Sequence, residues 1–369
     1  MKRTDFSVDW LFAACAPDTE LLPWNAQFTP VDLPHDWQIR HADDLYRDGT
    51  LFYRKYFFVT DVPGTRRMLW FGGAYMDTTV FVNGTEVGQW KYGYTSFWFD
   101  ITDALHEGQN EVLVRCNLRH PNSRWYSGAG LYRNVELWEA PDLHLMPDGL
   151  YVVAKEGDNG AWTVAVTAEA GSVTAASAGH TLTLHLTDDN GSLLGTAAIP
   201  ADAWAALPSP DGWRTGKETA IYKASHTFTL QDPALWDLDA PSFYHITAEL
   251  TGADGVTDTL TTRFGCRTIE ATPDCGLLVN HKRVLIKGVC IHHDFGCLGS
   301  AFEYSAAKRQ LEILKSMGVN SIRTGHTPPA PQFMDLADEM GILMDVESFD
   351  CWRSGKNPYD YGRFFDEWQ

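Results

Sequence analysis

The stretch VNSIRTGHTPPAPQFMDLADEMGILMDVES, from Val319 to Ser348, decides the fold of the last third of the chain. A short apolar run ends at Arg323, a proline-rich turn follows, and a second apolar run begins at Ile342. Between the runs, apolar residues recur at i, i+3, i+4 and i+7, at Phe333, Leu336, Ala337 and Met340. This spacing predicts an amphipathic helix between two strands, which is the order of a parallel βαβ unit.

The residues before this stretch repeat the same order. RVLIKGVCI, residues 283–291, is a nearly continuous apolar run that predicts a parallel strand buried on both faces. SAAKRQLEILKSMG, residues 305–318, predicts a helix with Ala307, Leu311 and Leu314 on one stripe and Gly318 at its end. Together the segments predict βαβαβ, the opening of a parallel α/β fold.

The earlier residues predict two all-β domains. Short alternating runs are separated by the turn pairs Asn83-Gly84, Asn190-Gly191 and Asp254-Gly255, which are hairpin signals. We expect a jelly-roll β-sandwich over residues 1–142 and an immunoglobulin-like β-sandwich over residues 143–269. Residues 270–369 are expected to hold the predicted βαβαβ segment, the opening of a parallel α/β fold.

Polar residues follow each predicted parallel strand. The candidates are His292, His293 and Asp294 after the first strand, Arg323 and His326 after the second, and Asp345, Glu347 and Asp350 after the third. Taken one at a time, each could be a solvated loop residue. Because ligands meet the carboxyl ends of parallel strands, the three groups together predict a polar pocket.

Composition limits the partners. The formal net charge of −19 argues against nucleic acid or an anionic membrane, and no apolar run reaches the length of a membrane span. Seven cysteines without CxxC spacing indicate free thiols in a reducing compartment, so a cytoplasmic protein is expected. The basic tip and the short run from Trp10 to Ala16 make secretion the less favoured alternative. Neither a metal nor a cofactor is predicted, since no zinc spacing and no phosphate loop is present.

Five phrases carry a resemblance to a known family. They are VDLPHDW (31–37), LFYRKYF (51–57), NSRWYSGAGLYRNVEL (122–137), LIKGVCIHHDFGCLG (285–299) and NSIRTGHTPPAPQFMDLADEMGILMDVE (320–347). In this order the chain resembles, over essentially its whole length, the N-terminal part of glycoside hydrolase family 2, closest to its β-galactosidase-like members.

The resemblance implies that residues 270–369 are the first βαβαβ part of a (β/α)8 TIM barrel. It also implies roles for several residues. Arg323 would support the nucleophilic Glu, while His292 and His326 would contact the sugar. The loop with Asn122 and Arg124 would reach the barrel mouth and contribute to substrate binding. Asp294, Glu347 and Asp350 are possible pocket carboxylates. The metal-binding Glu-x-His of some members is replaced here by Cys351-Trp352-Arg353, which again predicts no metal.

The resemblance also implies what to expect beyond these residues. In the family the acid/base and nucleophile Glu follow later barrel strands, so both are expected beyond Gln369. We therefore expect a truncated N-terminal part of a retaining, exo-acting β-glycosidase, inactive alone, whose full-length parent hydrolyses terminal β-galactosides. The alternatives are a β-glucuronidase or β-mannosidase of the same family, or a non-catalytic carbohydrate-binding module. A homo-oligomer is possible, because members often form dimers or tetramers.

Overall fold

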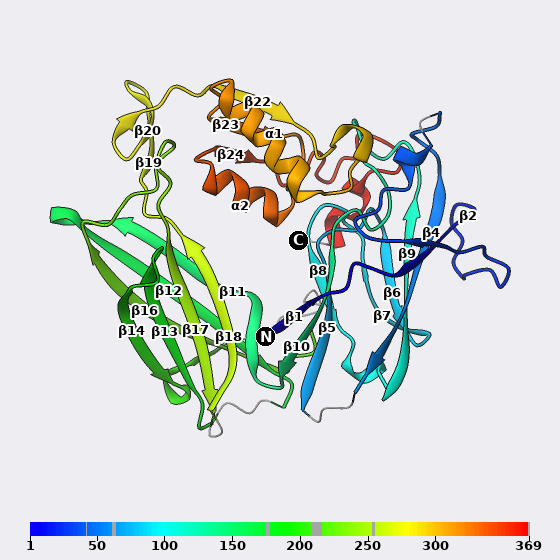
Figure 1. The fold of residues 1–369 in the computed structure, drawn as a ribbon, viewed down its shortest axis with the longest axis horizontal. Helices are drawn as coiled ribbons and strands as arrows, with labels where there is room; N and C mark the ends of the chain where they lie inside the picture. Colours follow the sequence, from blue (N-terminus) through cyan, green and yellow to red (C-terminus); the bar gives the residue numbers. More distant parts are fainter. Residues whose placement is uncertain (42, 61–63, 175–177, 208–215, 253–254, 368–369) are drawn as a thin grey trace.

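The computed structural model describes residues 1–41, 43–60, 64–174, 178–207, 216–252 and 255–367. These residues form two β-sandwiches and a parallel α/β portion that lies across one end of both (Figure 1). None of the helices in the described ranges is both long and apolar enough to cross a membrane. The fold expected from the sequence is confirmed.

The first sandwich is the jelly-roll domain. Its larger sheet has the order β3-β2-β4-β9-β6-β7 and its smaller sheet the order β1-β10-β5-β8. The strands are β1 (Lys2–Asp5), β2 (Trp10–Cys15), β3 (Thr29–Val31), β4 (Gly49–Val59), β5 (Thr65–Phe71), β6 (Thr78–Val82), β7 (Thr85–Trp90), β8 (Phe97–Asp100), β9 (Gly108–Leu118) and β10 (Val135–Pro141). Alternating residues of β4 and β9 bury Leu51, Tyr53, Val112 and Val114 between the sheets. The predicted Asn83-Gly84 turn joins β6 to β7, and both residues have positive φ.

The second sandwich packs the sheet β11-β12-β16-β15 against the sheet β14-β13-β17-β18. Its strands are β11 (His144–Glu156), β12 (Ala161–Ser172), β13 (Thr181–Asp188), β14 (Leu193–Pro200), β15 (Ala205–Leu207), β16 (Ala220–Gln231), β17 (Tyr244–Gly252) and β18 (Gly255–Phe264). Leu182, Leu184 and Leu186 lie on one buried face of β13, as their alternation predicts. The hairpin at Asn190-Gly191 is present, whereas Asp254 lies outside the described residues.

A small antiparallel sheet leads from the second sandwich into the parallel portion. It contains β19 (Ile269–Thr272), β20 (Gly276–Val279) and β21 (Lys282–Arg283). The parallel sheet follows in the order β22-β23-β24, with strands β22 (Gly288–Ile291), β23 (Ser321–Thr324) and β24 (Leu343–Val346). Helices α1 (Tyr304–Ser316) and α2 (Pro331–Glu339) cover one face, where Ala307, Leu311, Phe333 and Leu336 meet Ile322. The expected βαβαβ unit is therefore confirmed.

The predicted strand over residues 283–291 is only partly correct. Residues 284–287 do not belong to a strand, and Leu285 and Ile286 are exposed. The expectation that this run is buried on both faces is wrong here, because the helices cover one face of the sheet. Val289 and Ile291 pack against that core, whereas Cys290 on the other face is exposed. An apolar run shows the burial that a strand can accept, and the layers packed on the sheet decide whether both faces are covered.

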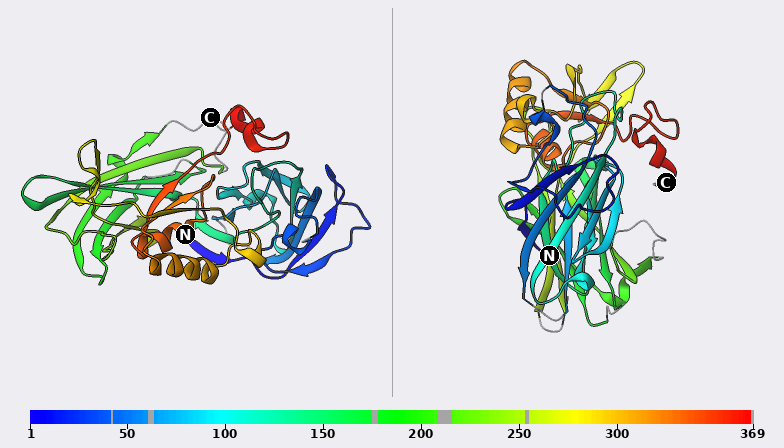
Figure 2. Two further views of the ribbon diagram at one scale, coloured as in Figure 1. Left: turned by 90° about the horizontal axis from the view of Figure 1, so that it is seen from above. Right: turned by 90° about the vertical axis from the view of Figure 1, so that its right-hand side faces the viewer.

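The segment after β24 returns to the jelly-roll domain. Cys351, Tyr361 and Phe364 are buried within the core cluster of that domain, and the Tyr92 hydroxyl donates to the Ser348 carbonyl at 2.6 Å. Figure 2 shows this segment, which ends in a 3-10 helix at Tyr361–Glu367, beside the jelly-roll strands. The segment that follows the parallel sheet is thus packed against the first domain.

Candidate active site

Three groups of side chains meet at the carboxyl ends of the parallel strands. His292 follows β22, His326 follows β23, and Glu347 follows β24. The imidazoles of His292 and His326 are 5.8 Å apart between ring centroids, nearly perpendicular to one another. The predicted convergence of polar residues at this edge of the sheet is therefore observed.

Arg323, His326 and Glu347 form one connected cluster. The Arg323 guanidinium makes an ion pair with the Glu347 carboxylate, and His326 Nδ1 lies 2.9 Å from Glu347 Oε2. An ionised carboxylate only accepts hydrogen bonds, so His326 Nδ1 carries the proton and donates it to this bond. The other ring nitrogen, Nε2, is not engaged by Glu347.

His292 is fixed by a residue of the jelly-roll domain. The Trp125 indole stacks on its ring with centroids 4.3 Å apart and an interplanar angle of 11°. The same indole donates its N–H to Asp294 Oδ1 at 3.2 Å. Burial lowers the pKa of His292, so this imidazole is neutral at pH 7 and offers one donor and one acceptor.

A second contact joins the jelly-roll loop to the segment that follows β24. Arg124 makes a two-point hydrogen-bonded ion pair with Asp350, and Lys356 Nζ lies 2.8 Å from the same carboxylate. Burial alone would raise the pKa of Asp350, but the bonds from Arg124 and Lys356 outweigh it and lower the pKa. The carboxylate is therefore ionised, and both cations are engaged by it.

A buried carboxylate anchors the loop that carries these residues. Asp36 accepts hydrogen bonds from the Tyr126 hydroxyl, the Ala129 N–H, and both the N–H and the hydroxyl of Ser300. Gly128 approaches the barrel loop so closely, at φ +68°, that a Cβ there would clash with Ser300. The jelly-roll loop is therefore held against the barrel immediately beside the site.

His293, next to His292, belongs to the packing beneath the site. Its Nε2–H donates to the Ser127 carbonyl at 2.9 Å, and its ring lies edge-on to Tyr94. Burial lowers its pKa to about 4. Two adjacent histidines thus have different surroundings, one facing the pocket and one facing the domain interface.

Asn122 does not lie where the resemblance suggested. Its side chain is buried, with Nδ2 donating to the Arg119 carbonyl and Oδ1 accepting from the Tyr75 hydroxyl. It does not line the pocket, so the expectation of direct sugar contact is corrected. Asn122 holds the base of the loop because a buried amide must satisfy its own donors and acceptor.

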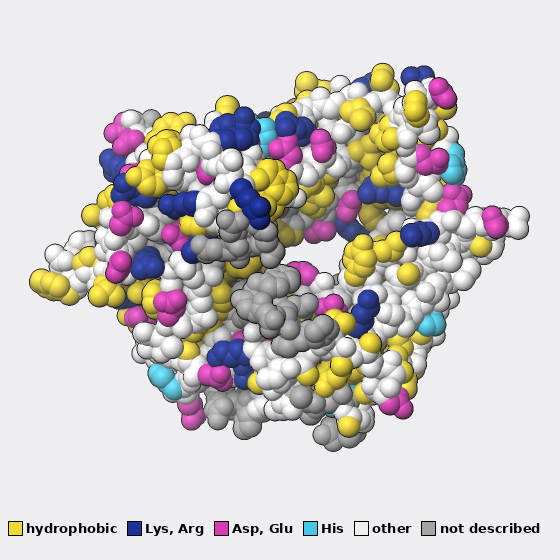
Figure 3. Space-filling view, turned by 180° about the vertical axis from the view of Figure 1, so that it is seen from behind, with side chains coloured by type: hydrophobic (Ala, Val, Ile, Leu, Met, Phe, Trp, Pro, Cys, Tyr) yellow, Lys and Arg dark blue, Asp and Glu magenta, His cyan; other side chains and the backbone are white. Residues whose placement is uncertain are grey.

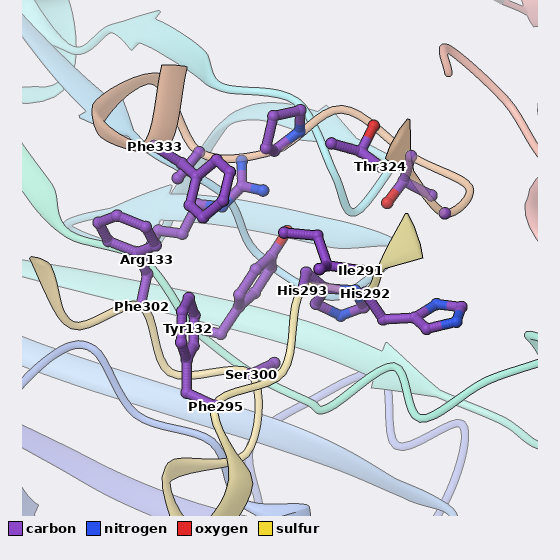
Figure 4. A pocket seen from close by; sticks show the side chains of 14 residues that line it. Tyr132, Arg133, Ile291, His292, His293, Phe295, Ser300, Phe302, Thr324 and Phe333 are labelled. Carbon is purple, nitrogen blue, oxygen red and sulfur yellow. The ribbon is translucent and has the colours of Figure 1, made fainter. Parts of the chain in front are cut away.

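The polar pocket lies between the jelly-roll loop and the loops that follow the parallel strands. Its lining comprises Tyr94, Ser123, Arg124, Trp125, His292, His293, Gly325, His326, Thr327, Asp350 and Tyr361. A neighbouring cavity is lined mainly by apolar side chains, including Phe295, Phe302 and Phe333 (Figure 4). In that view the His292 ring points away from the aromatic side chains. The polar pocket, rather than the apolar cavity, collects the groups that can bind hydroxyls.

Among the described residues, no group of three or more His, Cys, Asp and Glu is arranged to hold a metal ion. The polar side chains that line the pocket carry imidazoles, hydroxyls, an indole, the Arg124 guanidinium and the Asp350 carboxylate. Such groups, next to an aromatic surface, suit an uncharged polyhydroxylated ligand with both apolar ring faces and hydroxyls.

Three sequence models of one family match consecutive parts of the chain. The sugar binding domain of glycosyl hydrolases family 2 matches residues 23–141, a further family 2 domain matches residues 148–267, and the family 2 TIM barrel domain matches residues 271–358. The chain belongs to glycosyl hydrolase family 2. Its two sandwiches and its parallel portion are the family's sugar-binding, immunoglobulin-like and partial TIM-barrel domains.

Individual relatives within family 2 cover the whole chain. β-Galactosidase BoGH2A of Bacteroides ovatus is 35% identical over 100% of the chain, which spans 43% of that protein. A putative β-glucuronidase of Formosa agariphila is 31% identical over 99% of the chain and is itself 35% covered. A solved family 2 member from Bacteroides cellulosilyticus superposes with a TM-score of 0.88 at 29% identity, covering 100% of this chain and 48% of that one. The chain thus spans less than half the length of these relatives.

Two residues of this family 2 site were missed in the sequence. Trp125 lies within the motif NSRWYSGAGLYRNVEL, but the sequence does not show that its indole stacks on another ring. Asp36 lies in VDLPHDW, and its partners Tyr126 and Ser300 are separated from it by 90 and 264 positions. Only an alignment or a structure brings such distant positions together.

Proposed function

We propose that this chain supplies the substrate-contact part of a retaining, exo-acting β-glycosidase whose substrate is a terminal β-galactoside. The observation that carries the proposal is the meeting of His292, His326, Arg323 and Glu347 beneath the jelly-roll loop. The imidazoles of His292 and His326 line the pocket, where ring nitrogens can form hydrogen bonds with sugar hydroxyls. The relationship to a protein named β-galactosidase at 35% identity supports the choice of sugar.

Retaining hydrolysis needs a nucleophilic carboxylate and an acid/base carboxylate about 5 Å apart. Glu347 is engaged by Arg323 and His326, and Asp350 by Arg124 and Lys356, so each of these carboxylates serves a cationic or imidazole partner. The acid/base and nucleophile Glu are therefore proposed to come from later βα units of the complete barrel. Within that arrangement, Arg323 would stabilise the ionised nucleophile by its positive charge.

A β-glucuronidase is the competing assignment, since several relatives carry that name. A uronate carboxylate would require a cation that is free to pair with it. Arg124, the cationic residue among the described residues lining the pocket, is already paired with Asp350. This charge balance favours a neutral sugar.

The proposal is tested by assaying two proteins, the 369-residue chain and a version extended through the complete barrel. The substrates are p-nitrophenyl β-D-galactoside and p-nitrophenyl β-D-glucuronide. We expect no turnover by the shorter chain and faster turnover of the galactoside by the longer one. Turnover by the shorter chain would refute the assignment of catalysis to later units, and a preference for the glucuronide would refute the choice of sugar. No turnover of either compound by the longer protein would refute both the β-galactosidase and the β-glucuronidase assignment.

A further inference from the structure

Trp125 has a role that neither the family match nor the proposed function assigns. It belongs to the jelly-roll domain, yet it lies outside the core of that domain and half of its surface is exposed. Scattered exposed apolar residues are ordinary and need no function. Trp125 differs because partners in the barrel hold both its ring face and its N–H.

The two contacts of Trp125 are made to the same short barrel segment. The indole ring stacks on His292, and the indole Nε1–H donates to Asp294 Oδ1 two residues further along. Between them, His293 donates to the carbonyl of Ser127, two residues after Trp125. Residues 292–294 after β22 therefore all contact the loop, through Trp125 and Ser127.

We propose that Trp125 is a positioning residue that fixes the ring orientation of His292 toward the sugar. The inference rests on the proposed function, because it assumes that His292 contacts the substrate. The χ2 angle of a histidine is broadly distributed, so an unrestrained imidazole would sample many directions. A parallel indole at stacking distance removes that freedom, and its bond to Asp294 fixes the indole in turn.

This arrangement gives the jelly-roll domain a direct influence on the barrel chemistry. The Asp36 network and the Arg124 ion pair set the loop on either side of Trp125. Displacement of the loop would therefore release His292 without any change in the barrel itself. A neutral imidazole with a fixed plane presents its donor or acceptor to one hydroxyl rather than to several, so the interaction contributes to selectivity.

The first test uses the 369-residue chain and needs no activity. Histidine side-chain NMR spectra are recorded for wild type, Trp125→Ala, Trp125→Phe and the control Trp24→Ala, whose target side chain is 97% exposed. The His292 signal is assigned from its loss in His292→Gln. We expect the ring-current shift of His292 to disappear in Trp125→Ala, to persist in part in Trp125→Phe, and to stay unchanged in Trp24→Ala.

The same spectra report the burial of His292. Removing the indole exposes the imidazole to water, so its titration in Trp125→Ala should move toward the ordinary histidine range. Retained signals of the other histidines show that the variant is folded. An unchanged His292 signal and titration in folded Trp125→Ala would overturn the proposal.

The second test is a double-mutant cycle in the version with the complete barrel. Trp125→Ala should lower kcat/KM for the galactoside about 10- to 100-fold, with partial rescue by Trp125→Phe. In a His292→Ala background the same change should cost less than about threefold, because the residue that it positions is gone. Additive losses would overturn the positioning role while leaving the glycosidase intact. Absence of wild-type turnover would refute the proposed function. The NMR spectra would still show whether Trp125 holds the His292 ring.

Discussion

The jelly-roll sheet is antiparallel and the barrel sheet is parallel, and the two sheets also differ in what surrounds each strand. β4 lies between β2 and β9, and its inward residues Leu51 and Tyr53 are fully buried. β23 is also central in its sheet, yet only one of its faces is covered. Ile322 is buried beneath the helices, whereas the side chain of Arg323, one residue later, is 45% exposed on the other face.

The closed core of the sandwich stabilises the fold, whereas the open face of the parallel sheet leaves side chains that can contact a ligand. Two facing antiparallel sheets close a core with their own residues and leave few groups for a ligand. The open face and carboxyl edge of the parallel sheet collect ionisable groups that the jelly-roll loop then holds in place. Charged groups of both signs are interspersed on the face of the molecule shown in Figure 3. In the described part of this face, charged side chains of one sign do not gather into a broad patch. The groups suited to bind a ligand are those that line the pocket.

The largest expected effect concerns the closed core. Trp10 is fully buried, its ring lies edge-on to Phe6, and its N–H donates to the Phe6 carbonyl at 2.7 Å. Trp10→Ala should lower the free energy of unfolding by about 3–5 kcal/mol, because it leaves both a cavity and an unsatisfied carbonyl. Urea denaturation measures the change. Exposed Trp24→Ala is the control and should stay within about 0.5 kcal/mol, and equal losses in the two variants would contradict the contrast.

The next effect compares the two sheets directly by amide hydrogen exchange. In the 369-residue chain, amides of β22, β23 and β24 should exchange about a hundredfold faster than those of β4 and β9. The reason is that the parallel sheet has three strands, two of them edges, and one uncovered face. The exposed edges should also promote association of the chain. Equal protection of both sheets in a monomer would show that the parallel sheet is stabilised as fully as the sandwich.

A smaller effect should appear with pH at the interface between the two regions. The pKa of His293 is lowered by burial to about 4, against 6.5 for a free imidazole. Between these values the unfolded chain binds a proton that the folded chain does not, so stability should fall as pH decreases from about 6.5 to about 4. The total is on the order of 1–3 kcal/mol.

His293→Gln keeps an N–H donor for the Ser127 carbonyl and should flatten part of this profile in urea denaturation at pH 7 and pH 5. Buried His35, whose pKa is also lowered to about 4 by burial, should preserve the remaining slope. A variant with an unchanged profile would mean that His293 is not the titrating group.

The smallest expected effect is on a contact made by His281. This contact joins the second sandwich to the antiparallel sheet that leads into the barrel. His281 lies between Glu156 and Glu270, at 2.7 and 2.8 Å, and the hydrogen bond to Glu156 is the main cause of its raised pKa. Its contribution to stability should be complete below about pH 6.5 and disappear as the pH rises through the raised pKa. His281→Asn, which tolerates the positive φ at this position, should remove the difference between melting temperatures at pH 6 and pH 8.5. A persistent difference would assign it to other groups.

Much of the fold follows from local patterns. The spacing of Phe333, Leu336 and Ala337 predicted α2, and Asn83-Gly84 predicted the hairpin between β6 and β7. The apolar run over residues 283–291 misled, because the residues of a strand cannot show whether another layer covers each face of the sheet. For the site, the order of strands and polar residues was enough to predict that His292, His326 and Glu347 converge.

The sequence by itself determined the three-domain architecture, the polar carboxyl edge of the parallel sheet, and the family resemblance carried by its motifs. These depend on periodicity and on residues that are close in the chain. Only the tertiary structure decided that Asn122 is buried, that Asp36 joins the two loops, and that Trp125 covers His292. Those outcomes depend on how separately folded domains pack, and the contacts involved connect residues as many as 264 positions apart. No local pattern encodes such distances, because the packing of whole domains sets them.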